Sequence, residues 1–167
     1  TLERGRKMIN LTIIAVGKLK EKYLVEGVNE YVKRISKYAK IDIVEVPDEK
    51  NPSNDSDSEI KKILDIEGQM IISKIPKDAY IITLEINGEL ISSEELALLI
   101  DKTTQFESNR IVLIIGGSHG LSDQVKSLKN KALSFSKMTF PHQLMRLILV
   151  EQVYRGLSII NHSSYHK

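Results

Sequence analysis

R-I-V-L-I-I-G-G-S-H-G-L, residues 110–121, is the stretch that decides the fold of this chain. Residues 111–115 are an unbroken aliphatic run, which is typical of a strand buried on both faces of a parallel sheet. Gly116, Gly117 and Gly120 follow at once. Glycines after such a strand let the backbone turn sharply and approach a ligand at the carboxyl edge of the sheet. The stretch therefore predicts an α/β fold with a loop suited to binding.

Outward from this strand, the hydrophobic periodicity alternates between that of strands and that of helices. Strands are expected at 9–16, 41–46, 79–86, 110–115 and 132–135, and helices at 24–38, 56–74, 92–106, 122–130 and 141–160. Ser56 and Ser92 each precede a glutamate by three residues, which is the spacing of a capping box. Asn87-Gly88 is expected to close the strand before it, and Pro141 suits the first turn of the last helix. The alternation predicts the α/β class, with a mostly parallel sheet flanked by helices.

Length and composition limit the class of protein. A chain of 167 residues is expected to form a single domain, assigned to residues 8–167, and residues 1–7 are interpreted as an upstream start or a remnant of cloning. The chain has no cysteine, which excludes disulfides, thiol nucleophiles and cysteine-ligated metals. Its longest apolar run is 111–115, whereas about 20 residues are needed to span a bilayer. We therefore expect no membrane segment and a cytoplasmic location.

Charge is unevenly distributed along the chain. The net charge is only +2, but the segment 124–167 holds seven lysines and arginines against one acid, Glu151, while 45–67 holds eight acids and three lysines. Part of the acidic segment, the polar residues 47–58, is expected to be a mobile loop. A basic C-terminal third favours a polyanionic partner, although solvated lysines on one face would give the same pattern.

The glycine-rich stretch matches neither of two common nucleotide motifs. A dinucleotide fingerprint reads G-x-G-x-x-G and a phosphate-binding loop ends in G-K-S or G-K-T, but residues 116–121 read G-G-S-H-G-L. A nucleotide-phosphate enzyme built on residues 116–120 is one alternative that this leaves open. A tight turn that binds no ligand is the other.

A second candidate stretch is L-S-F-S-K-M-T-F-P-H-Q-L-M-R, residues 133–146. It runs from a strand through a loop of small polar and apolar residues into a helix, whose positive N-terminal end would lie beside the loop. Backbone N–H and C=O groups between apolar walls would suit the Watson–Crick edge of an adenine. An ordinary strand-to-helix connection is the alternative.

The C-terminal end is the third candidate. Tyr165, His166 and Lys167 combine a stacking ring, a titratable imidazole and an ammonium, which suits RNA chemistry. A frayed end is the usual alternative for the last residues of a chain. Because these residues lie outside every predicted helix and strand, their removal is expected to change stability little. His162 and His166 have H-x-x-x-H spacing, but no Glu or Cys ligand accompanies them, so no metal is expected.

Several strings taken together identify a family. They are I-A-V-G-K-L-K-E-K-Y at 14–23, V-P-D-E-K at 46–50, E-G-Q at 67–69, T-L-E-I-N-G at 83–88, I-I-G-G-S-H-G-L at 114–121, S-F-S-K-M-T-F-P-H-Q at 134–143, E-Q-V-Y-R at 151–155 and Y-H-K at 165–167. From residue 8 onward the chain resembles the RlmH family, SPOUT-class methyltransferases that act on a pseudouridine of large-subunit ribosomal RNA.

The resemblance implies a SPOUT-type α/β fold with a C-terminal trefoil knot, a homodimer, and S-adenosyl-L-methionine as the cofactor. It implies methylation of N3 of a pseudouridine in the ribosomal RNA of the assembled ribosome, without a metal. The residues that it places around the cofactor are Leu84, Gly116, Phe135, Ser136, Lys137, Met138, Thr139 and Phe140.

The resemblance also implies roles at the RNA for Arg155, Tyr165, His166 and Lys167. His166 would act as the general base that removes the N3 proton, and Arg155 would stabilise negative charge on the carbonyl oxygens of the base. Tyr165 would stack at the site, and Lys167 would contact phosphate. A non-catalytic ribosome-associated factor that binds RNA through its basic C-terminal third is the remaining alternative.

Overall fold

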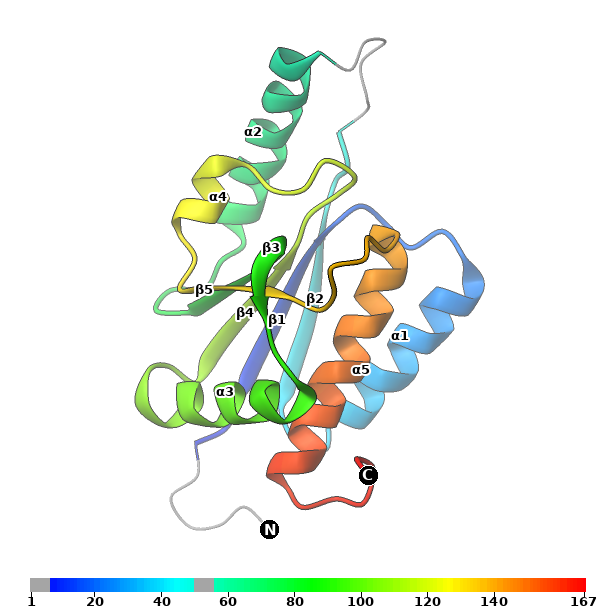
Figure 1. Ribbon diagram of the computed structural model, residues 1–167, viewed down its shortest axis with the longest axis vertical. Coiled ribbons are helices and arrows are strands. Elements are labelled where there is room, and N and C mark those ends of the chain that lie inside the picture. Colours follow the sequence, from blue (N-terminus) through cyan, green and yellow to red (C-terminus); the bar gives the residue numbers. More distant parts are fainter. Residues whose placement is uncertain (1–6, 50–55) are drawn as a thin grey trace.

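The fold comes from a computed structural model that describes residues 7–49 and 56–167. Its elements in chain order are β1 (Asn10–Val16), α1 (Lys22–Ile35), β2 (Lys40–Val46), α2 (Asp57–Ser73), β3 (Tyr80–Leu90), α3 (Ser93–Phe106), β4 (Arg110–Ile115), α4 (Asp123–Ser127), β5 (Lys131–Ser134) and α5 (His142–Ile160). Strands and helices alternate along the described chain, as the periodicity predicted (Figure 1).

The five strands of the described residues form one sheet in the order β2-β1-β4-β3-β5, and every neighbouring pair is parallel. β1 lies between β2 and β4, so that Ile13 pairs with Ile43 on one side and Leu113 on the other. The aliphatic run at 111–115 is therefore a strand with a neighbour on each side, and the predicted parallel sheet is confirmed. The C-terminal trefoil knot stays a prediction.

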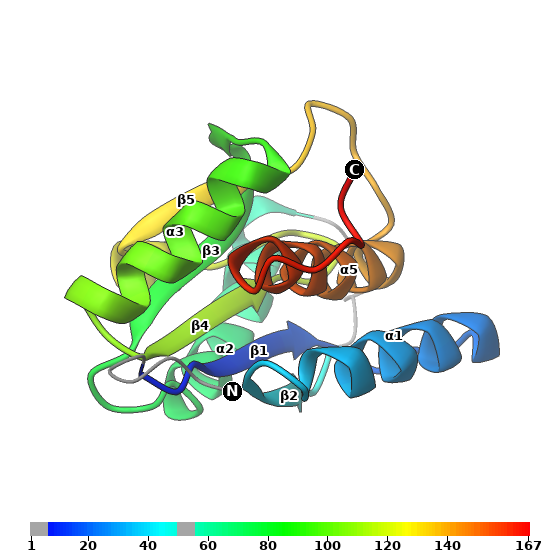
Figure 2. The same ribbon diagram turned by 90° about the horizontal axis from the view of Figure 1, so that it is seen from below.

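Helices cover both faces of the sheet. α1, α3 and α5 pack on one face, and Figure 2 shows them in a row with α5 in the middle. α2 and α4 lie against the other face, where Ile71 and Val125 pack on the sheet. β4 packs against the helices on both faces, because Leu113 belongs to the apolar cluster under α1, α3 and α5 and Val112 to the apolar cluster under α2 and α4. Burial on both faces explains why the strand is aliphatic without alternation.

The predicted helix starts are mostly confirmed. At α3, the Ser92 hydroxyl accepts from the Glu95 backbone N–H and the Glu95 carboxylate accepts from that of Ser92, which completes the capping box. Ser56 caps α2 in only one direction, accepting from the backbone N–H of Glu59. Pro141 lies just before the first residue of α5 rather than in its first turn. Of the loop predicted at 47–58, residues 50–55 lie outside the described residues.

One predicted boundary is wrong, because β3 does not end before Asn87-Gly88. The strand pairs with β5 at Leu84, leaves the ladder over four residues, and pairs again at Glu89, both times opposite Leu133. A Cβ on Gly88 would lie 2.6 Å from the Leu133 carbonyl carbon. The asparagine and glycine therefore mark a bulge inside the strand, where only glycine lets the two backbones approach so closely.

Candidate functional site

A cavity of about 620 Å³ opens where the chain leaves the carboxyl ends of β3, β4 and β5. Its walls are the β3 bulge, the glycine loop after β4, the loop between β5 and α5, and the first turn of α5. The apolar part of the wall consists of Leu84, Ile86, Ile115, Leu121, Leu133, Phe135, Met138, Phe140 and Met145. A cavity of this size and mixed lining fits one small organic ligand.

The glycine loop closes on itself at one wall of the cavity. Gly117 and Gly120 form a single bridge, in which the Gly120 N–H donates to the Gly117 carbonyl at 3.1 Å. Gly120 has φ +85°, and a Cβ on Gly116 would overlap the carbonyl of Gly120. The glycines thus serve the turn and also leave loop backbone at the wall of the cavity. The role of the glycines in the turn is therefore confirmed, whereas ligand binding by this loop stays a prediction.

Asp48 and Glu67 are a pair of neighbouring carboxyl groups, and Asp48 lies beside the glycine loop. Asp48, just after β2, lies beside Gly117, where an added Cβ would come within 3.7 Å of its Oδ1. Glu67 of α2 is only 4% exposed, and its Oε2 accepts from the Glu49 backbone N–H at 3.0 Å. Burial, opposed by that hydrogen bond and reinforced by nearby Asp48, raises the pKa of the Glu67 carboxyl to about 7.

The β3 bulge brings a carboxylate to the cavity wall. Glu85 lines the cavity, and its Oε2 accepts from the Thr83 hydroxyl at 2.6 Å and from the Lys129 ammonium at 2.8 Å. Burial alone would raise the pKa of the Glu85 carboxyl, but these hydrogen bonds outweigh it and lower that pKa below its ordinary value. Glu85 is therefore a fixed negative charge at neutral pH, and it is a residue that the sequence analysis did not single out.

The structure brings together seven of the eight residues predicted to hold a cofactor. Leu84, Gly116, Phe135, Ser136, Met138, Thr139 and Phe140 all line the cavity. Lys137 is the exception, because it is exposed and does not belong to the lining. The Ser136 hydroxyl accepts from the Met138 backbone N–H at 2.9 Å, which turns the loop and directs the intervening Lys137 to solvent.

The basic C-terminal third does not form an unpaired basic face. Arg146 is 2% exposed, with Nη1 2.6 Å from Glu45 and Nη2 2.9 Å from the Gly17 carbonyl oxygen. Three other cations of this segment form ion pairs, namely Lys129 with Glu85, Lys131 with Glu89, and Arg155 with Glu151. The inference of a polyanionic partner from charge alone is thus weakened, since acids from other parts of the chain pair with three of the seven cations and Glu151 pairs with a fourth.

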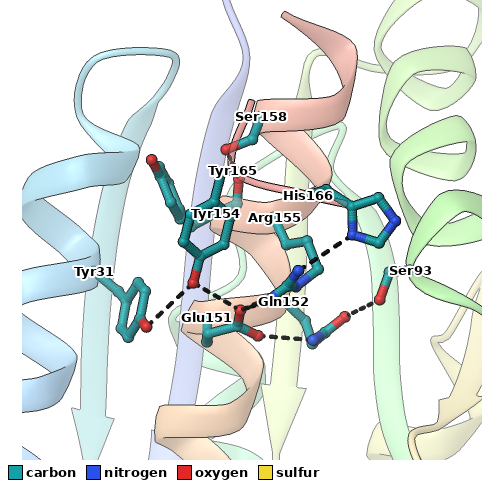
Figure 3. A network of polar contacts seen from close by, with 9 residues as sticks. All are labelled: Tyr31, Ser93, Glu151, Gln152, Tyr154, Arg155, Ser158, Tyr165 and His166. Carbon is teal, nitrogen blue, oxygen red and sulfur yellow. Dashed lines mark hydrogen bonds and ion pairs between the residues drawn. The ribbon is translucent and has the colours of Figure 1, made fainter. Parts of the chain in front are cut away.

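The C-terminal residues dock on α5 instead of fraying (Figure 3). The Tyr165 ring lies edge-on to Tyr154, with centroids 4.7 Å apart, and its hydroxyl donates to Glu151 Oε1 at 3.0 Å. The hydroxyl of Tyr31 on α1 lies 3.3 Å from that of Tyr165. Because Tyr165 gives its only hydroxyl proton to Glu151, Tyr31 is the donor in this second bond. Lys167 is exposed.

His166 is held between two charged residues in the docked tail. Its Nδ1 lies 3.2 Å from Arg155 Nη1, and its Nε2 lies 2.7 Å from Glu94 Oε1. Arginine can only donate, so Nδ1 is the acceptor and the proton is on Nε2, where it is donated to Glu94. The lone pair that a general base needs is therefore occupied, and His166 can take a proton at Nδ1 only after its bond with Arg155 is broken.

The two groups of predicted residues do not meet within this chain. Met145, in the cavity wall, precedes Arg155 by ten residues, which is about 15 Å along a helix. Figure 1 places the start of α5 near the β5–α5 loop and its end near the C-terminus, beside α1. The residues predicted to hold the cofactor thus lie at one end of α5, and Arg155, Tyr165 and His166 lie toward the other.

Two further observations concern metals and membranes. Within residues 7–49 and 56–167, no group of three or more His, Cys, Asp or Glu side chains is arranged to hold a metal ion. In the same part of the chain, no helix has the length and apolar character required to cross a membrane.

A parallel α/β sheet with this cavity at its carboxyl edge, walled by loop backbone and apolar side chains, defines a protein that binds a small organic ligand or cofactor. Residues 9–166 match the family model described as "Predicted SPOUT methyltransferase". The chain belongs to the SPOUT methyltransferase family. It is therefore a methyltransferase, and its reaction requires a methyl donor.

Relatives of known name match nearly the whole chain. A protein of Listeria monocytogenes serovar 1/2a named "Ribosomal RNA large subunit methyltransferase H" is 54% identical over 159 residues, which cover 95% of this chain and all of that protein. A Bacillus pumilus protein with the same name is 55% identical over the same length and coverage. The family resemblance found in the sequence strings is thus confirmed over the full length of these relatives.

Solved structures support the fold at lower sequence identity. A "Probable Methyltransferase" from Bordetella pertussis Tohama I superposes with a TM-score of 0.53 at 11% identity, covering 90% of this chain and 95% of that one. A "probable methylase family protein" from Haemophilus influenzae Rd KW20 gives a TM-score of 0.50 at 11% identity, covering 95% of this chain and 70% of that one.

Proposed function

We propose that this protein transfers the methyl group of S-adenosyl-L-methionine to N3 of a pseudouridine in large-subunit ribosomal RNA within the assembled ribosome. The observation that carries the proposal is the single cavity that gathers Leu84, Gly116 and the loop 135–140 apart from Lys137. It occurs in a chain 54% identical to a named ribosomal RNA large subunit methyltransferase. A ribosomal substrate also places the activity in the cytoplasm.

The cavity has the chemistry that this cofactor requires. Apolar side chains such as Leu84, Ile115 and Leu133 suit the faces of an adenine, and the backbone of the glycine loop and of the loop 135–140 suits its polar edge. The Glu85 carboxylate, which is paired with Lys129, adds a polar hydrogen-bond acceptor to the cavity wall. When bound, S-adenosyl-L-methionine supplies an already activated methyl group.

The protein residues then have two tasks, alignment and removal of the N3 proton. The cavity walls align the methyl group for an in-line displacement, and good alignment alone is worth several kcal/mol, up to about 7 to 11 in the best cases. Arg155 stabilises the negative charge that develops on the base oxygens, and His166 accepts the proton after its bond with Arg155 is released. Tyr165 and Lys167 hold the RNA by stacking and phosphate contact.

The active unit in this proposal is a homodimer. Leu144, Leu147 and Ile148 on α5 are only partly buried, so apolar surface at the cavity end of this helix is available to a second copy. A dimer also gives the cavity of one protomer access to the tail of the other. We expect heterodimers of a Gly116→Val protomer and a protomer that ends at Ser164 to regain activity that neither homodimer has. No activity above the sum of the two homodimers would contradict a shared site.

The proposed reaction is tested directly with ribosomes that lack the modification. Purified protein is incubated with labelled S-adenosyl-L-methionine and undermethylated ribosomes, and the label is mapped on the RNA by nuclease digestion and mass spectrometry. We expect one methyl group on N3 of one pseudouridine of the large subunit. Label on another nucleotide, or binding of the cofactor without transfer, would contradict the proposal.

A further inference from the structure

The carboxylate of Glu151 is the centre of the polar network at the C-terminal end (Figure 3). We propose that Glu151 is a positioning residue for methyl transfer, which fixes Arg155 and the C-terminal Tyr165 in the geometry that the RNA base meets. This inference rests on the proposed function. Glu151 itself contacts neither substrate nor cofactor in this assignment, and it acts through the two residues that it holds.

The contact with Arg155 fixes the plane of the guanidinium. Glu151 Oε1 accepts from Arg155 Nη2 at 2.6 Å and from Nε at 3.0 Å. The pair is one helical turn apart, and both side chains are mostly buried, with 19% and 25% exposed. Two hydrogen bonds from one edge of the guanidinium leave Nη1 on the other edge, where it meets His166. Arg155 is thus oriented before any RNA arrives.

The contact with Tyr165 fixes the tail. The same Oε1 atom accepts from the Tyr165 hydroxyl, and the Arg155 guanidinium carbon lies 4.8 Å from the centroid of the Tyr165 ring. Burial, the Tyr31 hydroxyl and the Glu151 carboxylate together raise the pKa of the Tyr165 phenol, so it remains a neutral donor. A single carboxylate oxygen therefore joins a helix residue to a residue ten positions further along the chain.

The carboxylate is itself held by a chain of hydrogen bonds to α3. Its second oxygen accepts from Gln152 Nε2 at 2.7 Å, and Gln152 Oε1 accepts from the Ser93 hydroxyl at 2.6 Å. Both oxygens are thus occupied, which restricts the rotamer of Glu151. Such support is what holds a catalytic arginine within a fraction of an ångström, and a misplacement of about 1 Å can lower a rate by about 10²-fold.

Substitutions of Glu151 test the assignment by single-turnover methylation of undermethylated ribosomes. Glu151→Gln keeps one oxygen acceptor but loses the charge, and we expect its rate to be lower by roughly tenfold. Glu151→Ala keeps neither the acceptor nor the charge, and we expect its rate to be lower by about 10²-fold. Affinity for S-adenosyl-L-methionine should stay within twofold, because Glu151 does not line the cavity. The matched control is Glu30→Gln. Glu30 and Arg34 on α1 form another Glu–Arg pair with the same spacing, and loss of its charge should leave the methylation rate unchanged.

A double-mutant cycle separates positioning from a merely structural role. Because Glu151 acts through Arg155 as well as through Tyr165, Glu151→Gln should lower the rate by a smaller factor in an Arg155→Ala background than in the parent protein. Independent, additive losses would overturn the proposal, and so would a normal rate in Glu151→Ala. A fall in rate for Glu30→Gln equal to that for Glu151→Gln would also overturn it.

A second measurement keeps the inference separable from the proposed function. Carboxypeptidase should release Lys167, His166 and Tyr165 several-fold faster from Glu151→Gln than from the parent protein, because the tail loses its anchor. If the parent protein does not methylate ribosomes, the proposed function is wrong, and this comparison still decides whether Glu151 orders the tail. Equal release from both proteins would overturn the inference.

Discussion

The two ends of α5 are built in different ways. At its first turn, the cavity is walled by backbone loops and apolar side chains, and most of its members come from three continuous strings of sequence. Toward its other end, Glu151, Arg155, Tyr165 and His166 form a network of side chains, joined to Tyr31 on α1 and Glu94 on α3. The first end depends on the path of the chain, whereas the second depends on individual hydrogen bonds.

This difference determines how each end responds to substitution. A backbone-walled cavity is sensitive to changes that move a loop and tolerant of changes in side chains that point away from it. A network centred on one carboxylate is sensitive to the loss of single atoms and should leave the cavity intact. The following substitutions test this comparison, beginning with the largest expected effect.

Removal of Tyr165, His166 and Lys167 should give the largest effect. We expect methyl transfer to fall by at least about 10²-fold, because the proposed general base is lost, while cofactor affinity stays within twofold. The free energy of unfolding should also fall by about 1 to 2 kcal/mol, since the Tyr165 ring packs on Tyr154 and its hydroxyl is bonded. Single-turnover rates and urea denaturation measure the two effects. Normal turnover in the shortened chain would mean that the catalytic group lies elsewhere.

Gly116→Val should disable the other end. An added side chain overlaps the Gly120 carbonyl, so the loop must move and the cavity must change shape. We expect loss of the stabilisation that saturating S-adenosyl-L-methionine gives the parent, which is about 2.7 kcal/mol at 100 times the dissociation constant. Thermal melting with and without cofactor measures it. The control is Gly156→Ala, where the new Cβ would meet its nearest neighbour at an ordinary 3.5 Å. A full cofactor shift in Gly116→Val would contradict the assignment of the cavity.

Glu67→Gln tests whether the buried Glu67 carboxyl, near Asp48, holds a proton in the folded protein. The pKa of Glu67 is about 7 in the folded protein, above that of an exposed glutamate, so the folded state binds this proton more tightly than the unfolded state. The proton on Glu67 therefore stabilises the folded state. This stabilisation is complete below about pH 4 and is lost as the pH rises to about 7. We expect the parent to lose about 3 kcal/mol across this window, and Glu67→Gln to lose less. Urea midpoints from pH 4 to 8 measure the slope. If the urea midpoint of Glu67→Gln changed with pH as steeply as that of the parent, a buried proton on Glu67 would be contradicted. The control is Asp65→Asn, on the exposed side of α2.

Lys137→Ala should have the smallest effect. Although its string predicts a cofactor contact, the side chain points away from the cavity. We expect the affinity for S-adenosyl-L-methionine to change by less than about twofold, which is within ±0.5 kcal/mol for a surface substitution. Isothermal titration calorimetry measures it beside Phe135→Ala, which removes part of the wall. A tenfold loss of affinity in Lys137→Ala would show that the loop closes over the ligand.

The fold was predictable because its determinants are local. The aliphatic run at 111–115, the capping box at Ser92 and the 3.6-residue periodicity of α5 each act within a few residues, and each is confirmed. The β3 bulge was missed because Asn87-Gly88 has the same appearance in a bulge as in a turn, and only the pairing with Leu133 distinguishes them. Strand order could not be read from periodicity, which contains no information about which strands pair.

The candidate site also has one part that was predictable from local sequence and one part that was not. Seven of the eight residues predicted to hold the cofactor fall around one cavity because they occupy strings that the backbone keeps together. The network around Glu151 was not predicted, since Tyr31 and Tyr165 or Glu94 and His166 meet only through the packing of α1, α3 and α5. A local signal did exist for its centre, because Glu151 and Arg155 have the i, i+4 spacing of an ion pair on a helix.

The strand order has a consequence for how the protein is made. β1 is synthesised first, but its neighbour β4 is complete only at Ile115, about 100 residues later. At roughly 5 to 20 residues per second, one edge of β1 waits at least about 5 seconds for its partner. Pairings between such distant segments slow folding, because chain entropy is lost before the contacts form. During that interval β1 is an apolar strand with an open edge, so translation rate and chaperone access should influence the yield of this enzyme more than its small size suggests.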